Sequence, residues 1–167
     1  MARQHLTVGV VAQSRKPVTR WARRGFAPVG VLVPVPATPP ATRLGPEGDV
    51  ETWYAGPAQV ALHSGDTSHY RDNLRSARPS LWVALKAGGL EVRLVTADPY
   101  EGEGLAGDPG LVVEAVAMPD TVRAEVAAFF EAHHVEEPFV KRKRKRADPE
   151  AMARGWVRVL DLREGEG

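Results

Sequence analysis

The side chains best suited to chemistry begin with two histidines in the middle of the chain. His63 and His69 are six positions apart, with Asp66 and Asp72 close by. Imidazole and carboxylate groups of this kind could supply three ligands to a metal ion, but only if the segment folds back on itself. A turn that carries ordinary polar residues is the favoured interpretation.

A second group collects four carboxylates within a stretch rich in glycine, namely Asp98, Glu101, Glu103 and Asp108. Hard cations such as Ca²⁺ and Mg²⁺ use carboxylate oxygens, yet this spacing lacks the EF-hand pattern and its terminal glutamate. The glycines do not open a helix carrying Lys and Ser or Thr, so no phosphate-binding loop is predicted. We interpret the stretch from Tyr100 to Gly110 as a solvated acidic loop.

The third group is the pair His133 and His134 near the end of a predicted helix. Neighbouring residues of a helix point about 100° apart, so the two rings are poorly placed to hold one metal ion, and a structural role is favoured. The chain has no cysteine, which excludes disulfides, thiolate ligands and a Cys nucleophile. No serine lies in a nucleophile elbow. The sequence therefore predicts no catalytic residue, no cofactor and no metal ion.

The segment around Arg71, Asp72 and Trp82 is dense in side chains that recognise ligands or partners. Arg71 and Asp72 could orient a ligand, although packing of a short helix on the sheet is the favoured role. Trp82 lies on the face opposite to the alternating apolar residues of its strand. Either both faces of that strand are covered, or Trp82 belongs to a binding surface.

Positive charge is concentrated near the C-terminus of a chain whose net charge is only +1. Six consecutive basic residues stand there: Lys141, Arg142, Lys143, Arg144, Lys145 and Arg146. Such a run can bind nucleic-acid phosphates or anionic lipid with strong salt dependence. No aromatic residues are interleaved with it, so an acidic protein partner is at least as well supported, with Phe139 as an apolar anchor.

The hydrophobic pattern predicts a fold rich in strands. We expect strands at Leu6–Ala12, Val29–Val33, Glu51–Tyr54, Gln59–His63, Leu81–Leu85, Leu90–Val95 and Leu111–Ala117. Alternation and the glycines at 88 and 89 make the hairpin of residues 81–95 the clearest element. A turn is expected at Gly56-Pro57 and a surface loop at Pro34–Pro46, and a strand interior is unlikely between Pro17 and Pro28.

Two helices complete the predicted fold. Ser68 is expected to cap a short helix at His69–Arg75. A longer helix is expected from about Pro119 to His134, with Val122, Val126, Phe129 and His133 as its apolar stripe. Together these elements predict an α+β fold: an antiparallel sheet or open barrel of about six to seven strands, with a short inserted helix and a C-terminal helix packed on it.

The length of 167 residues fits one domain. We expect residues 1–135 to form it and residues 136–167 to form a basic, partly extended tail, with a short docked segment at Arg154–Leu162. The chain contains no run of about 18 apolar residues that could span a membrane, and its start lacks a secretory signal. A cytoplasmic location is therefore expected.

Several segments together resemble a known family. They are Trp53–Gly56, Tyr70–Leu74, Pro79–Leu85, Val95–Pro99, Glu101–Glu103, His133–Glu136, Phe139–Arg144 and Arg146–Glu150. The chain from Leu6 to about Glu150 resembles domain of unknown function 3305. That resemblance implies an uncharacterised bacterial protein encoded beside genes for molybdenum-dependent formate dehydrogenase and its maturation factors, with no defined catalytic residue.

The resemblance implies an accessory role in assembly or maturation of that enzyme, through a formate dehydrogenase subunit or maturation factor as protein partner. We therefore expect a protein-binding module that is not an enzyme. One alternative is a small enzyme or a nucleotide- or ligand-binding protein that uses the region of Arg71, Asp72, Glu101 and Glu103. A second alternative is nucleic-acid binding through the basic tail.

Overall fold

The computed structural model describes residues 1–138 and 140–142. Residues Met1–Val135 form one compact unit of strands and helices. The bounds are β1 (Arg3–Arg15), β2 (Gly25–Leu32), β3 (Thr42–Arg43), β4 (Val50–His63), the short 3-10 helix η1 (Ser64–Asp66), α1 (Thr67–Arg75), β5 (Ser80–Lys86), β6 (Val92–Thr96), α2 (Pro99–Leu105), β7 (Leu111–Ala117) and α3 (Asp120–His133). None of the described helices is both long enough and apolar enough to cross a membrane.

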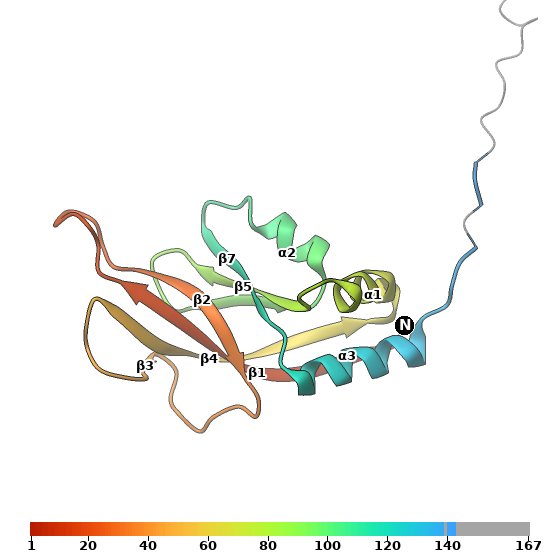
Figure 1. Ribbon diagram of the computed structural model, residues 1–167, viewed down its shortest axis with the longest axis horizontal. Helices are drawn as coiled ribbons and strands as arrows, with labels where there is room; N and C mark the ends of the chain where they lie inside the picture. The colour runs from red at the N-terminus through yellow and green to blue at the C-terminus, as the bar shows by residue number, and fades with distance from the viewer. Residues whose placement is uncertain (139, 143–167) are drawn as a thin grey trace, which may run out of the picture. The chain divides into compact units, whose positions relative to one another are not determined.

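The strands form one sheet in the order β2-β1-β4-β6-β5-β7, with β3 paired to β4 beside this path. Neighbouring strands run antiparallel except β4 and β6, which run parallel where Val60 faces Val95. The end strands β2 and β7 lie close together, so the sheet curls into a nearly closed barrel (Figure 1). The predicted α+β fold is confirmed, with a sheet that is mixed rather than wholly antiparallel.

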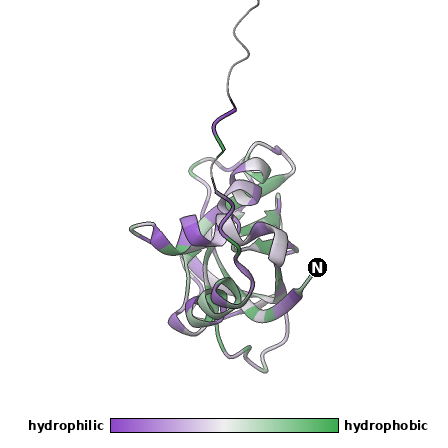
Figure 2. Cartoon of the chain, turned by 90° about the vertical axis from the view of Figure 1, so that its right-hand side faces the viewer, coloured by the Kyte–Doolittle hydropathy of each residue, from purple (hydrophilic) through white to green (hydrophobic). Residues whose placement is uncertain are grey.

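The hydrophobic core lies on the inner face of this curved sheet and beneath the helices. Its members come from alternate positions of the strands and from one stripe of α3, as period-two and helical patterns require. Hydrophobic and hydrophilic residues are accordingly interleaved along the elements (Figure 2). The core includes Val8, Val10, Val60, Leu62, Tyr70, Leu81, Val83, Leu85, Val116, Val122, Val126 and Phe129.

Three predicted elements are confirmed. The hairpin is present as β5 and β6, with Gly88 at φ 85° in the turn between them. The strand predicted at residues 111–117 is β7. Helix α3 buries Val122, Val126 and Phe129, whereas His133 is exposed and only its ring packs on Phe129, with centroids 4.5 Å apart. The predicted apolar stripe therefore ends one turn earlier than expected.

The turn predicted at Gly56-Pro57 is wrong, because β4 continues through both residues. Gly56 adopts φ 135°, and the pairing with β1 shifts register between Val10 and Val11, which marks a β-bulge. A bulge places one extra residue in a strand and needs the backbone freedom of glycine. The glycine therefore bends one long strand instead of separating two short ones.

Proline was also misleading at two other places. Pro28 lies inside β2, which is tolerated because β2 is an end strand and the pairing with β1 shifts register there. The predicted surface loop at residues 34–46 contains the short strand β3, in which Thr42 and Arg43 pair with Tyr54 and Trp53.

The predicted acidic loop at residues 100–110 is wrong in its first half, which forms α2. The Asp98 carboxylate accepts hydrogen bonds from the amides of Tyr100 and Glu101, and Pro99 occupies the first turn. An acidic cap followed by proline is a typical helix start. Likewise, α1 begins at Thr67 with Asp66 at its N-cap position, so the predicted cap Ser68 lies inside the helix.

Candidate functional site

Helices α1 and α2 flank a groove that contains several of the residues singled out from the sequence. The groove has a volume of about 480 Å³, and Asp72, Arg78, Trp82, Tyr100 and Glu103 are among its lining residues. We call it the α1–α2 groove. It brings together Asp72 from α1, Trp82 from β5 and Glu103 from α2, which are far apart in the sequence.

A buried amide that the sequence analysis did not single out fixes one wall of this groove. The Asn73 side chain donates hydrogen bonds to the carbonyl oxygens of Ser80 at 2.7 Å and Ala97 at 2.8 Å, and it accepts one from the Ser80 amide at 2.9 Å. These three bonds tie α1 to β5 and to the end of β6. In the sequence, the one pointer to Asn73 was its position beside Arg71 and Asp72. Its hydrogen-bond partners Ser80 and Ala97 become apparent only in the folded structure.

Arg71 and Asp72 do not converge on a common ligand site. Arg71 Nε lies 3.5 Å from Asp72 Oδ1, so these neighbours pair with each other on the partly exposed surface of α1. The Tyr100 hydroxyl donates to Asp72 Oδ2 at 2.9 Å, and this hydrogen bond raises the pKa of Tyr100. Asp72 thus links α1 to α2.

Trp82 is half-buried, because α2 crosses the strand face that carries it. A Cβ atom added at Gly102 would overlap Trp82 Cγ, so the helix backbone rests directly on the indole. Of the two alternatives left open by the sequence, both faces of β5 are covered at this position. Trp82 also lines the α1–α2 groove.

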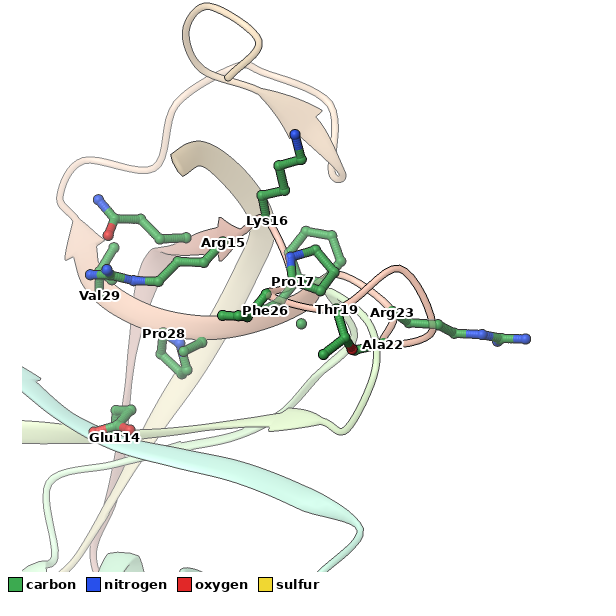
Figure 3. Close-up of a pocket in the computed structure, with 14 residues that line it drawn as sticks. Arg15, Lys16, Pro17, Thr19, Ala22, Arg23, Phe26, Pro28, Val29 and Glu114 are labelled. Carbon is green, nitrogen blue, oxygen red and sulfur yellow. The ribbon is translucent and has the colours of Figure 1, made fainter. Parts of the chain in front are cut away.

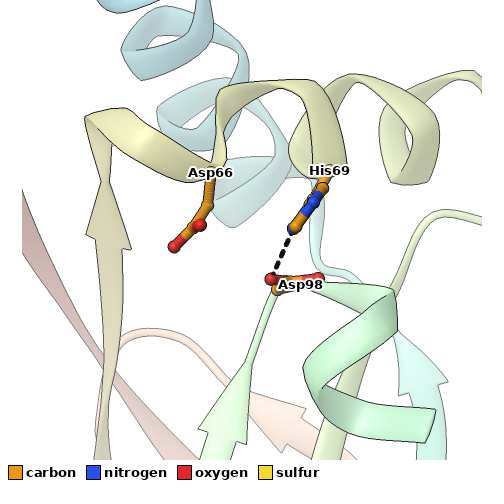
Figure 4. Close-up of side chains that lie close together, drawn as sticks. All are labelled: Asp66, His69 and Asp98. Atoms are coloured by element: carbon orange, nitrogen blue, oxygen red, sulfur yellow. Dashed lines mark hydrogen bonds and ion pairs between the residues drawn. The ribbon is translucent and has the colours of Figure 1, made fainter. Parts of the chain in front are cut away.

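Asp66, His69 and Asp98 form a second cluster beside the groove (Figure 4). One ligand atom from each lies within 4.8 Å of the other two, and His69 Nδ1 is 2.7 Å from Asp98 Oδ2. The Tyr100 ring packs against the His69 ring with centroids 4.6 Å apart. The cluster joins the start of α1 to the start of α2.

Further carboxylate charge lies next to this cluster. Glu101 Oε2 accepts a hydrogen bond from Thr96 Oγ1 at 2.6 Å. The buried Tyr70 hydroxyl accepts from the His63 amide at 3.0 Å. Burial raises the pKa of Tyr70 to about 12, and the charges of Asp66, Asp98 and Glu101 contribute to that rise. The hydroxyl therefore lies within the field of three carboxylates.

The structure divides the other predicted chemical groups among separate places. His63 and Asp72 do not join the cluster that contains Asp66 and His69. Asp108 binds the Gly110 amide at 2.8 Å in a turn beyond α2. His134 Nδ1 lies 3.0 Å from Thr67 Oγ1.

The β1–β2 hairpin carries a different kind of surface at its tip (Figure 3). A hollow of about 770 Å³ is lined by apolar residues, with Arg15, Lys16 and Arg23 as basic residues and Glu114 of β7 as an acid. We call it the basic hollow. Its apolar lining includes Pro17, Val18, Phe26, Pro28 and Val29.

Exposed apolar side chains are concentrated around this hollow and along the neighbouring segments. Val18 and Trp21 at the hairpin tip are 103% and 86% exposed. Further exposed apolar residues follow at Val29, Leu32, Val33, Leu44 and Val50. Clustered exposed apolar side chains of this kind mark contact surfaces.

Arg24 anchors the hairpin and is not part of its basic surface. Its guanidinium lies 3.3 Å from Glu51 Oε1 and donates to Ser14 Oγ at 2.8 Å and to the Gly48 carbonyl at 2.8 Å. Glu51 is only 5% exposed, and Arg43 lies 4.0 Å from its second oxygen. This network fixes β1, β2 and β4 beneath the hollow.

The predicted basic tail is described only at its beginning. Lys141 and Arg142 are exposed. Phe139, the residues from Lys143 to Arg146, and the segment at residues 154–162 lie outside the described part of the chain.

One protein family matches most of the chain, including the residues of these surfaces. Residues 7–143 match the model of the family described as protein of unknown function (DUF3305). The chain belongs to the DUF3305 family. The DUF3305 region contains the basic hollow, the α1–α2 groove and the cluster of Asp66, His69 and Asp98. Neither the curated proteins nor the solved structures include a match to the chain.

Proposed function

We propose that this DUF3305 protein is a protein-binding accessory module and that its basic hollow holds a segment of a client protein. The observation that carries the proposal is the combination of a large apolar hollow, exposed Val18 and Trp21, and a basic rim at the β1–β2 tip. The resemblance noted from the sequence supports a subunit or maturation factor of a molybdenum-dependent formate dehydrogenase as the client, in the cytoplasm of a bacterium.

The apolar part of the surface can supply binding energy. Tryptophan and arginine are enriched among the interface residues whose truncation costs the most binding affinity. Burial of one large apolar side chain contributes roughly 1.5–3 kcal/mol before the costs of association. Trp21 and Val18 are fully available for such burial because neither packs into the core.

The charges of the rim define the chemistry of the client segment. Arg15, Lys16 and Arg23 line the hollow together with one acid, Glu114. A complementary client presents acidic side chains around an apolar one, and the charges speed association as well as orient it. The basic run from Lys141 to Arg146 would provide a second contact of the same sign, with Phe139 beside it.

The α1–α2 groove offers a further contact to the same client. Asp72, Trp82 and Tyr100 line it, and its acidic residues would favour a basic client segment. Arg71, which pairs with Asp72, lies at the edge of this contact. The basic hollow remains the primary site because it is larger and because Val18 and Val29 of its lining are exposed.

The test is purification of the tagged full-length chain from its native host, with nuclease treatment and mass spectrometry of the retained proteins. A rim variant, Arg15→Gln/Lys16→Gln/Arg23→Gln, is compared with a control that loses three exposed arginines elsewhere, Arg3→Gln/Arg75→Gln/Arg123→Gln. We expect the wild type and the control to retain formate dehydrogenase subunits or maturation factors, and the rim variant to lose them.

Affinity for the purified client completes the test. We expect the rim variant to bind at least about tenfold more weakly, because it removes two arginines and a lysine at once and arginine is enriched among the interface residues whose truncation costs the most affinity. Equal affinity in the rim variant and the control would contradict the proposed surface. Loss of the retained proteins from the wild type on nuclease treatment would contradict the proposed function.

A further inference from the structure

We propose that Asp66, His69 and Asp98 bind a divalent first-row transition ion of the Zn²⁺ type. The site lies where η1, α1 and α2 meet. It is separate from the basic hollow, so the proposal is independent of the proposed function.

The three side chains already converge from two parts of the chain (Figure 4). Asp66 and His69 descend from the start of α1, and Asp98 meets them from the start of α2. The ligand atoms lie within 4.8 Å of one another, compared with about 3.3 Å between ligands around a tetrahedral Zn²⁺. Binding of one ion would require the Asp66 and His69 side chains to rotate and close that difference.

Two carboxylates converge on one imidazole at this site. Asp66 and Asp98 each place an oxygen within 4.8 Å of a His69 ring nitrogen. No Lys or Arg among the described residues forms an ion pair with either carboxylate. The Asp66 carboxylate also accepts no hydrogen bond from the described residues, so it remains available as a ligand.

The remaining ligands are held in place by their surroundings. Asp98 is 8% exposed, and its Oδ1 accepts the amide hydrogen bonds of α2 while Oδ2 faces His69. The Tyr100 ring packs on the imidazole, and the Tyr100 hydroxyl is fixed by Asp72. Support of this kind around the ligands orients them and increases metal affinity.

The donor set selects the class of ion. Imidazole suits Zn²⁺ and its first-row neighbours, whereas Ca²⁺ and Mg²⁺ prefer oxygen ligands alone. Three protein ligands leave at least one position for water or for a group from a bound molecule.

The test is titration of the untagged full-length chain with Zn²⁺ by calorimetry and with Co²⁺ by visible absorption. We expect one ion per chain in the wild type. Asp66→Asn and His69→Gln should each weaken binding by about tenfold or more. Asp98 is not substituted, because it also caps α2.

Matched controls are Glu131→Gln, an exposed carboxylate of α3, and His133→Gln, an exposed histidine at the end of the same helix. Both should bind as the wild type does. All variants are compared by thermal unfolding, and an ion-dependent rise in midpoint that is lost only in Asp66→Asn and His69→Gln would support the site. Absence of binding, equal binding in all variants, or preference for Ca²⁺ or Mg²⁺ would overturn it.

Discussion

The β1–β2 tip and the α1–α2 junction are built in opposite ways. The tip takes most of its surface from one stretch of sequence, residues 13–29, and leaves apolar and basic side chains exposed. The junction assembles acidic and aromatic residues from three separated segments and fixes them by hydrogen bonds. An exposed apolar surface suits a large partner, whereas a preorganised polar cluster suits a small ion.

Substitution of Arg24 has the largest expected effect on the free energy of unfolding. Arg24 holds the hairpin tip in place, whereas Arg15 and Arg23 are exposed. Arg24→Met should lower the free energy of unfolding by about 3 kcal/mol, since the buried Glu51 carboxylate loses its main partner. Arg23→Met should change it by less than about 0.5 kcal/mol. Urea unfolding of both variants measures the difference. Equal stability would show that the Glu51 network does not hold the hairpin.

Gly102 provides the corresponding test at the junction. A Cβ atom there would overlap Trp82, so Gly102→Ala should cost about 2 kcal/mol by forcing α2 away from β5. Gly104 in the same helix has no atom near an added Cβ, and Gly104→Ala should stabilise by about 0.5–1 kcal/mol. Urea unfolding distinguishes them. Two variants of equal stability would contradict the close packing of α2 on Trp82.

The raised pKa of Tyr70 predicts that the stability of the folded chain depends on pH. Its pKa is about 12 in the folded chain and 10.0 in the unfolded chain, so the unfolded state loses the proton first. This contribution to stability is complete below pH 10 and falls by about 1.4 kcal/mol per pH unit between pH 10 and 12.

Tyr70→Phe is the control, because it removes the titrating hydroxyl and keeps the ring in the core. The slope of unfolding free energy between pH 10 and 12 should be smaller in this variant than in the wild type. Denaturation at several pH values gives both slopes. Identical slopes would show that the Tyr70 hydroxyl is not shielded beside the acidic cluster.

Substitution of Trp21 should have the smallest effect on the free energy of unfolding. Trp21→Ala should change the free energy of unfolding by less than about 0.5 kcal/mol, because the indole is 86% exposed. The same variant should bind the client at least about tenfold more weakly. Thermal unfolding and client titration measure the two quantities. Loss of stability without loss of binding would reverse the role assigned to the tip.

Local sequence patterns were sufficient to predict the elements whose residues face one environment. Alternation gave β5, β6 and β7, and four-residue spacing gave α3 with Val122 and Val126 in the core. Glycine and proline gave wrong predictions where tertiary contacts decide their role. Gly56 bends a continuous strand, and Gly102 lets α2 lie on Trp82.

The candidate sites were harder to predict than the fold. Asp66 and His69 were recognised together, but their partner Asp98 is 29 residues beyond His69 and reaches it only through the packing of α1 beside α2. The basic hollow had a signal in the sequence, since Arg23, which lines it, and the neighbouring Trp21 stand between two predicted strands. That signal was interpreted as a connection because proline brackets it.

Photo-cross-linking from the hairpin tip tests the proposed binding surface most directly. A photoreactive phenylalanine replaces Trp21 in the full-length chain in its native host, and the same residue replaces the exposed Glu91 near the β5–β6 turn as the control. We expect an adduct with a formate dehydrogenase subunit or maturation factor from position 21 and none from position 91. An adduct from position 91 alone, or no adduct from position 21, would contradict the assignment of the β1–β2 tip as the client-binding surface.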